Sequence, residues 1–255
     1  IRNCLVALAD DESLMGRLFQ YRFSGGDLSG HSFGNLFLAA MTEVAGGFDT
    51  AIEESSHVLK IGGNVMPSTL ETVKLWAEKA DGARVCGETS ISAGEVACRR
   101  MWLEPMSPEA HRPAVKAISG ADLVVLGPGS LFTSVLPHLA VPGLARAITE
   151  SSGRRVYICN VMTQPGETTG FDAADHVAAI LDAAPGSVDA VVVHDGDLPQ
   201  DAIDRYAREG QEPVGVDRRR LEKLGVEVIA ADIAQPGREV RHDPATLAEV
   251  LLSRG

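Results

Sequence analysis

The stretch ADLVVLGPGSLFTS, residues 121–134, decides the fold. Its run LVVLG at 123–127 is short and wholly apolar, which predicts a strand buried on both faces of a parallel sheet. A glycine-rich turn follows, and a helix is predicted near 138–150. Three further apolar runs repeat the alternation, each before a predicted helix (near 172–183, 199–209 and 244–253): RVYICN at 155–160, AVVVHD at 190–195 and VEVIAADI at 226–233. The pattern predicts an α/β fold with a Rossmann-like, mainly parallel sheet that carries helices on both faces.

The first hundred residues have a different texture. Residues 1–23 predict a helix with no strand before it, and further helices are predicted near 33–46 and 48–55. Since α/β chains usually begin with a buried strand, we expect an N-terminal strand ahead of Ile1. Residues 57–104 are rich in predicted strands, with a helical stretch at 69–80 between them: HVLKI (57–61), ARVCG (83–87) and ACRRMWL (97–103). Without a repeat or a linker in the sequence, we expect one domain over 1–255, with 57–104 as a strand-rich insertion.

Charge and cysteine content exclude several classes of protein. The 255 residues include 23 Lys and Arg against 35 Asp and Glu, a net charge of −12, which argues against binding to nucleic acid or to an anionic membrane. The 4 cysteines form no Cys-x-x-Cys pair, so neither a zinc site nor a disulfide framework is expected. The apolar runs are too short to span a bilayer. We therefore expect a cytoplasmic protein without nucleic-acid or membrane partners.

The loop GPGSLFTS, residues 127–134, is the first candidate binding element. Gly127 and Gly129 permit close backbone approach, and the hydroxyls of Ser130 and Thr133 add donors next to a predicted helix start, which suits an anion. A third glycine and a P-loop lysine are missing, so this is not a dinucleotide fingerprint. Phosphate contact is our interpretation; the alternative is a tight turn capped by Ser130.

The loop CNVMTQPGETTGF, residues 159–171, follows the next predicted strand. Asn160, Thr163 and Thr168 are uncharged hydrogen-bonding groups of the kind that read sugar hydroxyls or a base edge, and Asp172 is a predicted helix cap. The alternative is a polar loop of ordinary composition. Because ligands of parallel sheets bind outside the carboxyl ends of the strands, we expect the two loops to lie side by side in one site.

Other sequence patterns give weaker indications of function. Gly30-His-Ser-Phe-Gly34 matches the nucleophile elbow Gly-x-Ser-x-Gly, but a turn and not a strand precedes it, so Ser32 is predicted to cap a helix instead. His194 and His242 each precede an aspartate, and adjacent side chains rarely converge on one metal, so no metal site is predicted. Arg218-Arg219-Arg220 indicates a solvated helix face.

Six segments in order resemble the bacterial gluconeogenesis-factor family, relatives of 2-phospho-L-lactate transferase: IRNCLVALAD (1–10), GHSFGNLFLAAM (30–41), GGNVMPST (62–69), ADLVVLGPGSLFTSVLP (121–137), CNVMTQPGET (159–168) and REVRHDP (238–244). Family members begin with a strand and a glycine-rich loop ahead of a Gly-Asp-Ile-Arg-Asn motif. The resemblance thus implies that such a segment precedes Ile1-Arg2-Asn3. The metal-binding aspartates of the transferases lie partly in that segment, so no metal residue can be assigned here.

The resemblance also implies a ligand and a role. The family binds UDP-sugars, notably UDP-N-acetylglucosamine, and links carbon supply on gluconeogenic substrates to cell-wall precursor synthesis and cell shape. By motif match, Asn3, Tyr206 and Arg241 are expected to contact the nucleotide-sugar. Tyr206 would stack on a base or sugar, and Arg241 would clamp a diphosphate. The alternative is that Tyr206 is a helix-surface aromatic and Arg241 an exposed charge.

Two functions stay open. The first is a non-catalytic sensor whose ligand is a UDP-sugar, with no certain cofactor and with a protein partner in cell-wall precursor regulation. The second is a transferase of phosphorus-containing groups, as in the relatives, because binding a diphosphate and transferring it use similar donors. The two loops offer no clear acid/base pair and no assignable catalytic residue, which favours the sensor. A homo-oligomer is compatible with either function.

Overall fold

The computed structural model describes residues 1–9, 14–235 and 239–253. The chain divides into two compact units, Ile1–Leu70 and Glu71–Gly255, which are described separately. Two compact units do not by themselves mean two independently folding domains, so the single domain expected from the sequence stays a prediction.

The N-terminal unit is helical. Its apolar core joins all four helices through Leu5, Phe19, Leu38, Ile52 and Leu59. The elements are α1 (Arg2–Leu8), α2 (Leu14–Gln20), the 3₁₀ turn η1 (Gly26–Leu28), α3 (Phe33–Ala45) and α4 (Phe48–Leu59).

The predicted cap of α3 is confirmed, because Ser32 Oγ accepts a hydrogen bond from the Asn35 amide at 3.2 Å. The single helix predicted over 1–23 is wrong: α1 ends at Leu8 and α2 begins at Leu14, and residues 10–13 lie outside the described residues.

The strand predicted at 57–61 is also wrong, since α4 extends to Leu59. The buried residues of α4 are Ala51, Ile52, Ser55 and Leu59, spaced as on one face of a helix. This period outweighs the strand propensity of the β-branched residues in HVLKI.

The parallel sheet predicted from the apolar runs is confirmed, with strand order β4-β5-β6-β7. Alternate residues of β5 face opposite layers. Tyr157 packs with α9, while Val156 and Ile158 pack with Leu247 of α12. The strands are β4 (Leu123–Leu126), β5 (Arg154–Ile158), β6 (Ala190–His194) and β7 (Glu227–Ala231).

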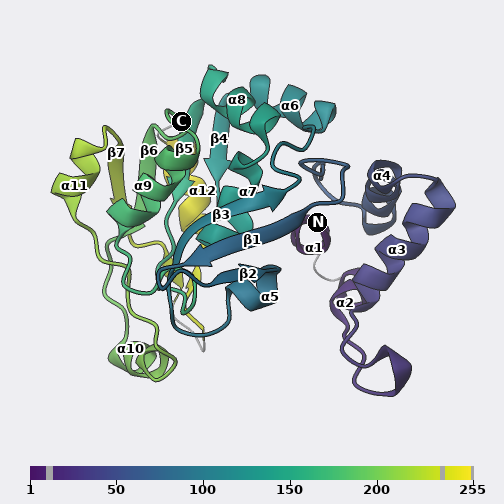
Figure 1. Cartoon of the computed structure of the whole chain (residues 1–255), viewed down its shortest axis with the longest axis horizontal. Helices are drawn as coiled ribbons and strands as arrows, with labels where there is room; N and C mark the ends of the chain where they lie inside the picture. Colours follow the sequence, from purple (N-terminus) through teal and green to yellow (C-terminus); the bar gives the residue numbers. More distant parts are fainter. Residues whose placement is uncertain (10–13, 236–238, 254–255) are drawn as a thin grey trace. The chain divides into compact units, whose positions relative to one another are not determined.

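Helices cover both faces of this sheet, as the α/β pattern predicts (Figure 1). The predicted helix near 138–150 is divided between α7 and α8, whereas the terminal helix has the predicted bounds. The helices are α6 (Arg112–Ser119), η2 (Leu131–Val135, a π-helical turn), α7 (Leu136–Leu139), α8 (Pro142–Glu150), α9 (Ala173–Ala183), α10 (Gln200–Ala207), α11 (Arg218–Lys223) and α12 (Pro244–Ser253).

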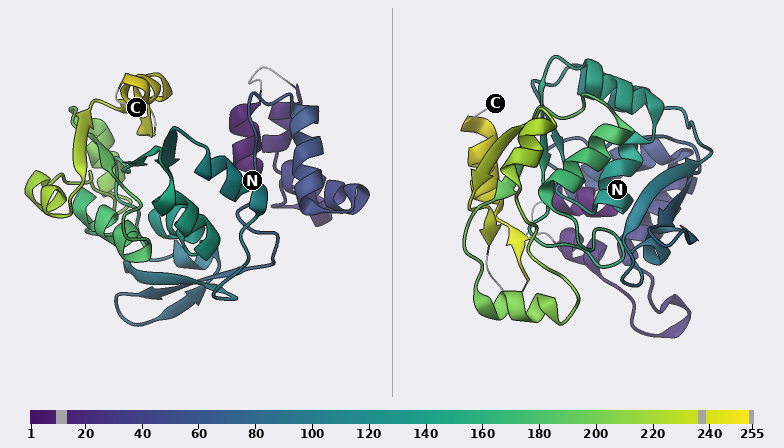
Figure 2. Two further views of the ribbon diagram at one scale, coloured as in Figure 1. Left: turned by 90° about the horizontal axis from the view of Figure 1, so that it is seen from above. Right: turned by 60° about the vertical axis from the view of Figure 1, so that its left-hand side comes forward.

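A second, antiparallel sheet with order β2-β1-β3 packs against the α9 side of the parallel sheet, opposite α12 (Figure 2, left). Trp76 of β1 pairs with Trp102 of β3, and the two rings stack with centroids 6.2 Å apart. The elements of this region are β1 (Lys74–Lys79), β2 (Arg84–Cys86), the short α5 (Glu88–Ile91) and β3 (Cys98–Glu104). Near the C-terminus, β8 (Ala234–Gln235) and β9 (Arg241–His242) form a separate antiparallel hairpin.

The helix predicted at 69–80 is therefore wrong, because β1 occupies half of it. Residues 74–79 pair with β3 on one side, and residues 76–78 pair with β2 on the other. Such partners across the sheet cannot be read from the period of one segment, and they override its local pattern.

No single helix of the described residues is long and apolar enough to cross a membrane. One pair, Leu131–Leu139 with Pro142–Glu150, meets that test jointly but is bent by 79°.

Tyr157 and His176 form a polar pair inside the core. The Tyr157 hydroxyl lies 2.9 Å from His176 Nδ1, and both side chains are completely buried. Burial lowers the pKa of His176 from 6.5 to about 4. The imidazole is thus neutral in the folded protein at neutral pH.

This burial predicts a stability loss in mild acid. His176 binds a proton more readily in the unfolded chain, so its stabilising contribution is present above about pH 6.5 and is lost as pH falls toward 4. Between about pH 7 and pH 5 the loss from this group should be about 2 kcal/mol. Urea unfolding of the wild type and His176→Gln at both pH values measures it. The variant should lose less stability than the wild type, and His57→Gln, with a side chain 71% exposed, should match the wild type. An equal loss in all three proteins would contradict this role.

Candidate functional site

The loop after β4 folds tightly against the end of β5. Gly127 has φ 85, and a Cβ there would lie 3.2 Å from the Ile158 carbonyl oxygen, so this position requires glycine. The loop then enters the π-helical turn η2. Ser130 precedes η2 but makes no side-chain cap, so the capping alternative is not observed.

The loops after β4 and β5 lie side by side, as the sequence predicts. The side-chain amide of Gln164 donates a hydrogen bond to Ser130 Oγ at 2.9 Å. The buried carboxylate of Glu167 accepts from Thr133 Oγ1 at 3.0 Å and from the Phe132 amide at 3.2 Å. These bonds fix the loops to each other at the carboxyl edge of the sheet.

Several hydroxyls predicted to contact a ligand are used inside the protein. Thr163 Oγ1 accepts a hydrogen bond from the backbone amide of Glu212, and Thr168 Oγ1 accepts one from the backbone amide of Gln164, both at 2.9 Å. Both threonines are buried. In this arrangement they shape the loop, and their contact with a ligand stays a prediction.

A cavity of about 410 Å³ opens at the carboxyl ends of β5 and β6. Of the predicted site residues, Asn160 lines it, and its amide donates to Gln164 Oε1 at 3.1 Å. Gly127, Gly129, Ser130 and Thr133 are not in its lining. The wall combines apolar side chains with a few polar ones: Cys159, Asn160, Val161, Ala173, Val193, His194, Gly196, Asp197, Leu198, Gln200, Ile203, Pro213, Val214 and Val216.

The segment from the end of β6 to the start of α10 supplies polar groups that are not among the predicted ligand-binding residues. His194, Asp197 and Gln200 line the cavity. Burial of the Cys159 thiol, also in the wall, raises its pKa to about 12, so the thiol is protonated. Their position at the carboxyl end of a buried strand is the one at which parallel sheets bind ligands.

Tyr206 and Arg241 lie close together although 34 residues separate them. The Val240 amide donates to the Tyr206 hydroxyl at 2.8 Å, which ties β9 to α10. Arg241 is 75% exposed, and its guanidinium pairs with Glu239 at 2.5 Å. His242 is anchored to the cavity wall, because its Nε2 lies 3.1 Å from the Cys159 carbonyl oxygen.

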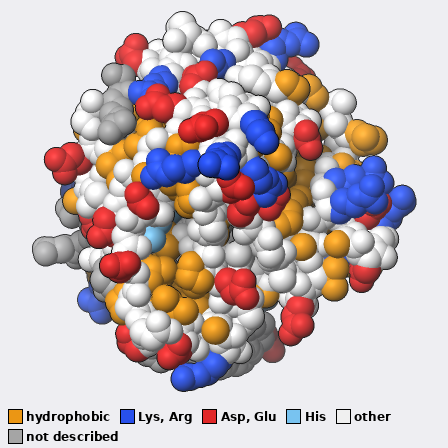
Figure 3. Space-filling view, turned by 90° about the vertical axis from the view of Figure 1, so that its left-hand side faces the viewer, with side chains coloured by type: hydrophobic (Ala, Val, Ile, Leu, Met, Phe, Trp, Pro, Cys, Tyr) orange, Lys and Arg blue, Asp and Glu red, His pale blue; other side chains and the backbone are white. Residues whose placement is uncertain are grey.

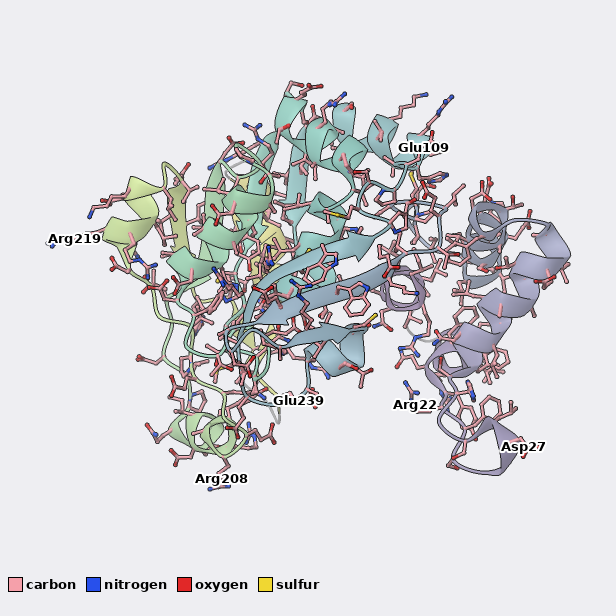
Figure 4. The ribbon with its side chains drawn as sticks, viewed as in Figure 1. Arg22, Asp27, Glu109, Arg208, Arg219 and Glu239 are labelled. Atoms are coloured by element: carbon pink, nitrogen blue, oxygen red, sulfur yellow. The ribbon has the colours of Figure 1, made fainter. Side chains whose placement is uncertain are left out.

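The outer surface of the C-terminal unit carries both apolar and basic side chains (Figure 3). On the face of the C-terminal unit formed by α10 and α11, a patch of apolar side chains lies beside a histidine and below a band of basic side chains (Figure 3). Glu239 and Arg208 lie at the same end of this unit, and Arg208 points away from it (Figure 4).

Asn3 belongs to the N-terminal unit. There a cavity of about 400 Å³ is lined by Arg2, Asn3, Val6, Ala7, Gln20 and Arg22. Arg2 Nη2 donates to Asn3 Oδ1 at 2.7 Å, and Arg22, labelled in Figure 4, donates to the Gly30 carbonyl. Two guanidinium groups and two amides suit an anion. Within the ranges that the structure describes, no group of three or more His, Cys, Asp or Glu could hold a metal ion.

Comparisons with known proteins agree on one family. The family model described as 2-phospho-L-lactate transferase CofD matches residues 1–234. A putative gluconeogenesis factor of Nostoc is 48% identical over 99% of this chain, which spans only 56% of that relative's length. The gluconeogenesis factor of Bacillus subtilis is 42% identical over 99% of this chain and 80% of its own. A crystal structure of a UPF0052-family protein from Bacillus halodurans superposes with a TM-score of 0.93 at 45% identity, covering 98% of this chain and 81% of that one.

The Glu167 network predicts a stability effect. Glu167→Gln replaces one acceptor oxygen by a donor amide that faces the hydroxyl and amide donors of Thr133, Phe132 and Ser92. A buried donor left without an acceptor costs about 1–3 kcal/mol. Urea unfolding should show a loss of this size, whereas Glu53→Gln on the exposed side of α4 should change little. Wild-type stability of Glu167→Gln would show that the network is not needed to hold the loops.

Proposed function

This chain belongs to the 2-phospho-L-lactate transferase CofD family, and we propose that it is a cytoplasmic regulator that binds a UDP-sugar, with UDP-N-acetylglucosamine as the first candidate. In this proposal it couples growth on gluconeogenic carbon to cell-wall precursor synthesis and cell shape. The observation that carries the binding function is the cavity at the carboxyl ends of β5 and β6, with apolar walls and a few polar side chains. Its position is the one at which parallel sheets bind nucleotides.

The distribution of basic side chains indicates separate places for the uncharged part of the proposed ligand and for its diphosphate. Among the described residues, the cavity lining includes no Lys or Arg, so the cavity suits the uncharged base or sugar. A diphosphate needs a cation, and Arg241 supplies one next to His242, which is bound to the cavity wall. Its present partner is the exposed carboxylate of Glu239, which a diphosphate would displace.

The regulatory role has two supports. Relatives at 42–48% identity are named gluconeogenesis factors, some of them putative. The carboxylate between the two loops, Glu167, is buried and accepts hydrogen bonds from three donors, which leaves it poorly placed to act as a base toward a ligand. We propose that the ligand-bound form acts on a protein partner in cell-wall precursor synthesis, as a monomer or a homo-oligomer.

Transferase activity is the second candidate, because the family model over residues 1–234 is that of a transferase. Incubation of the full-length protein with UDP-sugar or GTP, with and without 2-phospho-L-lactate, distinguishes the two. A defined product formed with turnover would replace the sensor by an enzyme.

Calorimetry tests ligand binding directly. The full-length protein is titrated with UDP-N-acetylglucosamine, UDP-glucose and GDP. The proposal expects saturable binding of at least one UDP-sugar in preference to GDP. No binding of any UDP-sugar, with the protein folded, would remove the proposed function.

Arg241 should determine affinity without affecting the fold. Arg241→Ala is expected to weaken UDP-sugar binding about ten- to a hundredfold, because a charge-assisted hydrogen bond to phosphate is lost. Arg241→Lys should recover only part of it, since an ammonium cannot form the bidentate contact. Calorimetry measures the affinities, with exposed Arg208→Ala as the matched control. Wild-type affinity in Arg241→Ala would take this residue out of the site.

Two substitutions of Tyr206 distinguish the role of its ring from the role of its hydroxyl. Tyr206→Ala should weaken binding about tenfold through loss of a stacking surface. Tyr206→Phe keeps the ring but loses the acceptor of the Val240 amide, so it should bind ligand nearly as the wild type while melting at a lower temperature. The opposite order, with Phe binding as poorly as Ala, would assign Tyr206 to holding β9 rather than to stacking.

A further inference from the structure

His194 is a buried polar side chain without a hydrogen-bond partner in the described part of the chain. It ends β6, lines the cavity, and its side chain is only 9% exposed. Neither ring nitrogen has a hydrogen-bond partner among the described residues. Burying an imidazole in this way is unfavourable for folding, so the site gains stability when a ligand supplies the missing contact.

Titratable side chains lie near the ring of His194. Asp232 Oδ1 lies 3.6 Å from Nδ1, while His242 and Asp197 are the other titratable groups that approach from the hairpin and from the β6 loop. Gly196 leaves the space open, because a Cβ there would lie 2.8 Å from His194 Cε1 and 2.3 Å from Asp232 Oδ1. A carboxylate beside Nδ1 favours the tautomer that carries its proton there. Nε2 is then an acceptor.

An acceptor at this place in the cavity calls for a hydrogen-bond donor from the ligand. Among the residues described, the lining contains no cation, and Val161, Val193, Val214 and Val216 give it apolar surface suited to a flat ring. Uracil carries a ring N–H at N3, whereas cytosine has an unprotonated nitrogen there and would face Nε2 acceptor to acceptor.

We propose that His194 is the residue that determines base specificity, its Nε2 accepting a hydrogen bond from the ring N–H of a bound uracil. The inference rests on the proposed UDP-sugar binding and goes beyond it, because it names the atom that selects the base.

The test compares UDP with CDP, and uridine with cytidine, by calorimetry on the full chain. The wild type should bind UDP about ten- to a hundredfold more tightly than CDP, as expected when one buried hydrogen bond is replaced by an acceptor–acceptor contact. In His194→Leu this preference should fall to within about threefold, mainly through weaker UDP binding. His194→Gln, which keeps an acceptor, should retain part of it. His57→Leu, in the N-terminal unit, is the matched control.

Melting temperature without ligand separates a binding role from a structural one. Because both nitrogens of His194 lack hydrogen-bond partners in the described structure, His194→Leu should melt at or above the wild-type temperature. A lower melting temperature, or a UDP preference that survives in His194→Leu, overturns the inference and leaves UDP-sugar binding intact. Wild-type protein that binds neither UDP nor any UDP-sugar overturns the proposed function itself.

Discussion

The buried carboxylate of Glu167 is the interaction on which the ligand-binding edge depends. It accepts hydrogen bonds from Ser92 beside the antiparallel sheet and from Thr133 and Phe132 after β4. The backbone carbonyl of Glu167 also accepts from the Cys98 amide at the start of β3. One residue therefore joins two sheets and two loops. The cavity wall at Asn160 is held by the same loop, so its geometry is set before a ligand arrives.

Buried Lys79 strengthens this junction from the other sheet. Its ammonium donates to the carbonyl oxygens of Ile91 and Gly166, directly beside Glu167. The glycine at 166 is required, because a Cβ there would lie 2.9 to 3.0 Å from three carbonyl oxygens of residues 92–94. The antiparallel strands are thus a support for the loop after β5, and their proximity to it explains why they interrupt the α/β pattern.

The sequence predicted the parallel sheet because strands buried on both faces have a composition that few other elements share. It misplaced β1 and the end of α4, whose identity depends on cross-strand partners and on a helical face spread over eight or more residues. The two loops were predicted, but the full wall of the cavity was not, since it combines Asn160 of the second loop with Pro213, Val214 and Val216, which are distant from it in sequence. The family resemblance named Tyr206 and Arg241 as ligand contacts, and the structure adds the hydrogen bond from the Val240 amide to the Tyr206 hydroxyl, which no sequence pattern indicates.

The stacked tryptophans of β1 and β3 are the only 2 in the chain. Their fluorescence emission therefore reports on the antiparallel sheet and on what is coupled to it, and not directly on the helices of the N-terminal unit. Far-ultraviolet circular dichroism, by contrast, weighs those helices heavily. An unfolding curve followed by both signals would separate if the two compact units lose structure independently and would coincide if they act as one cooperative body.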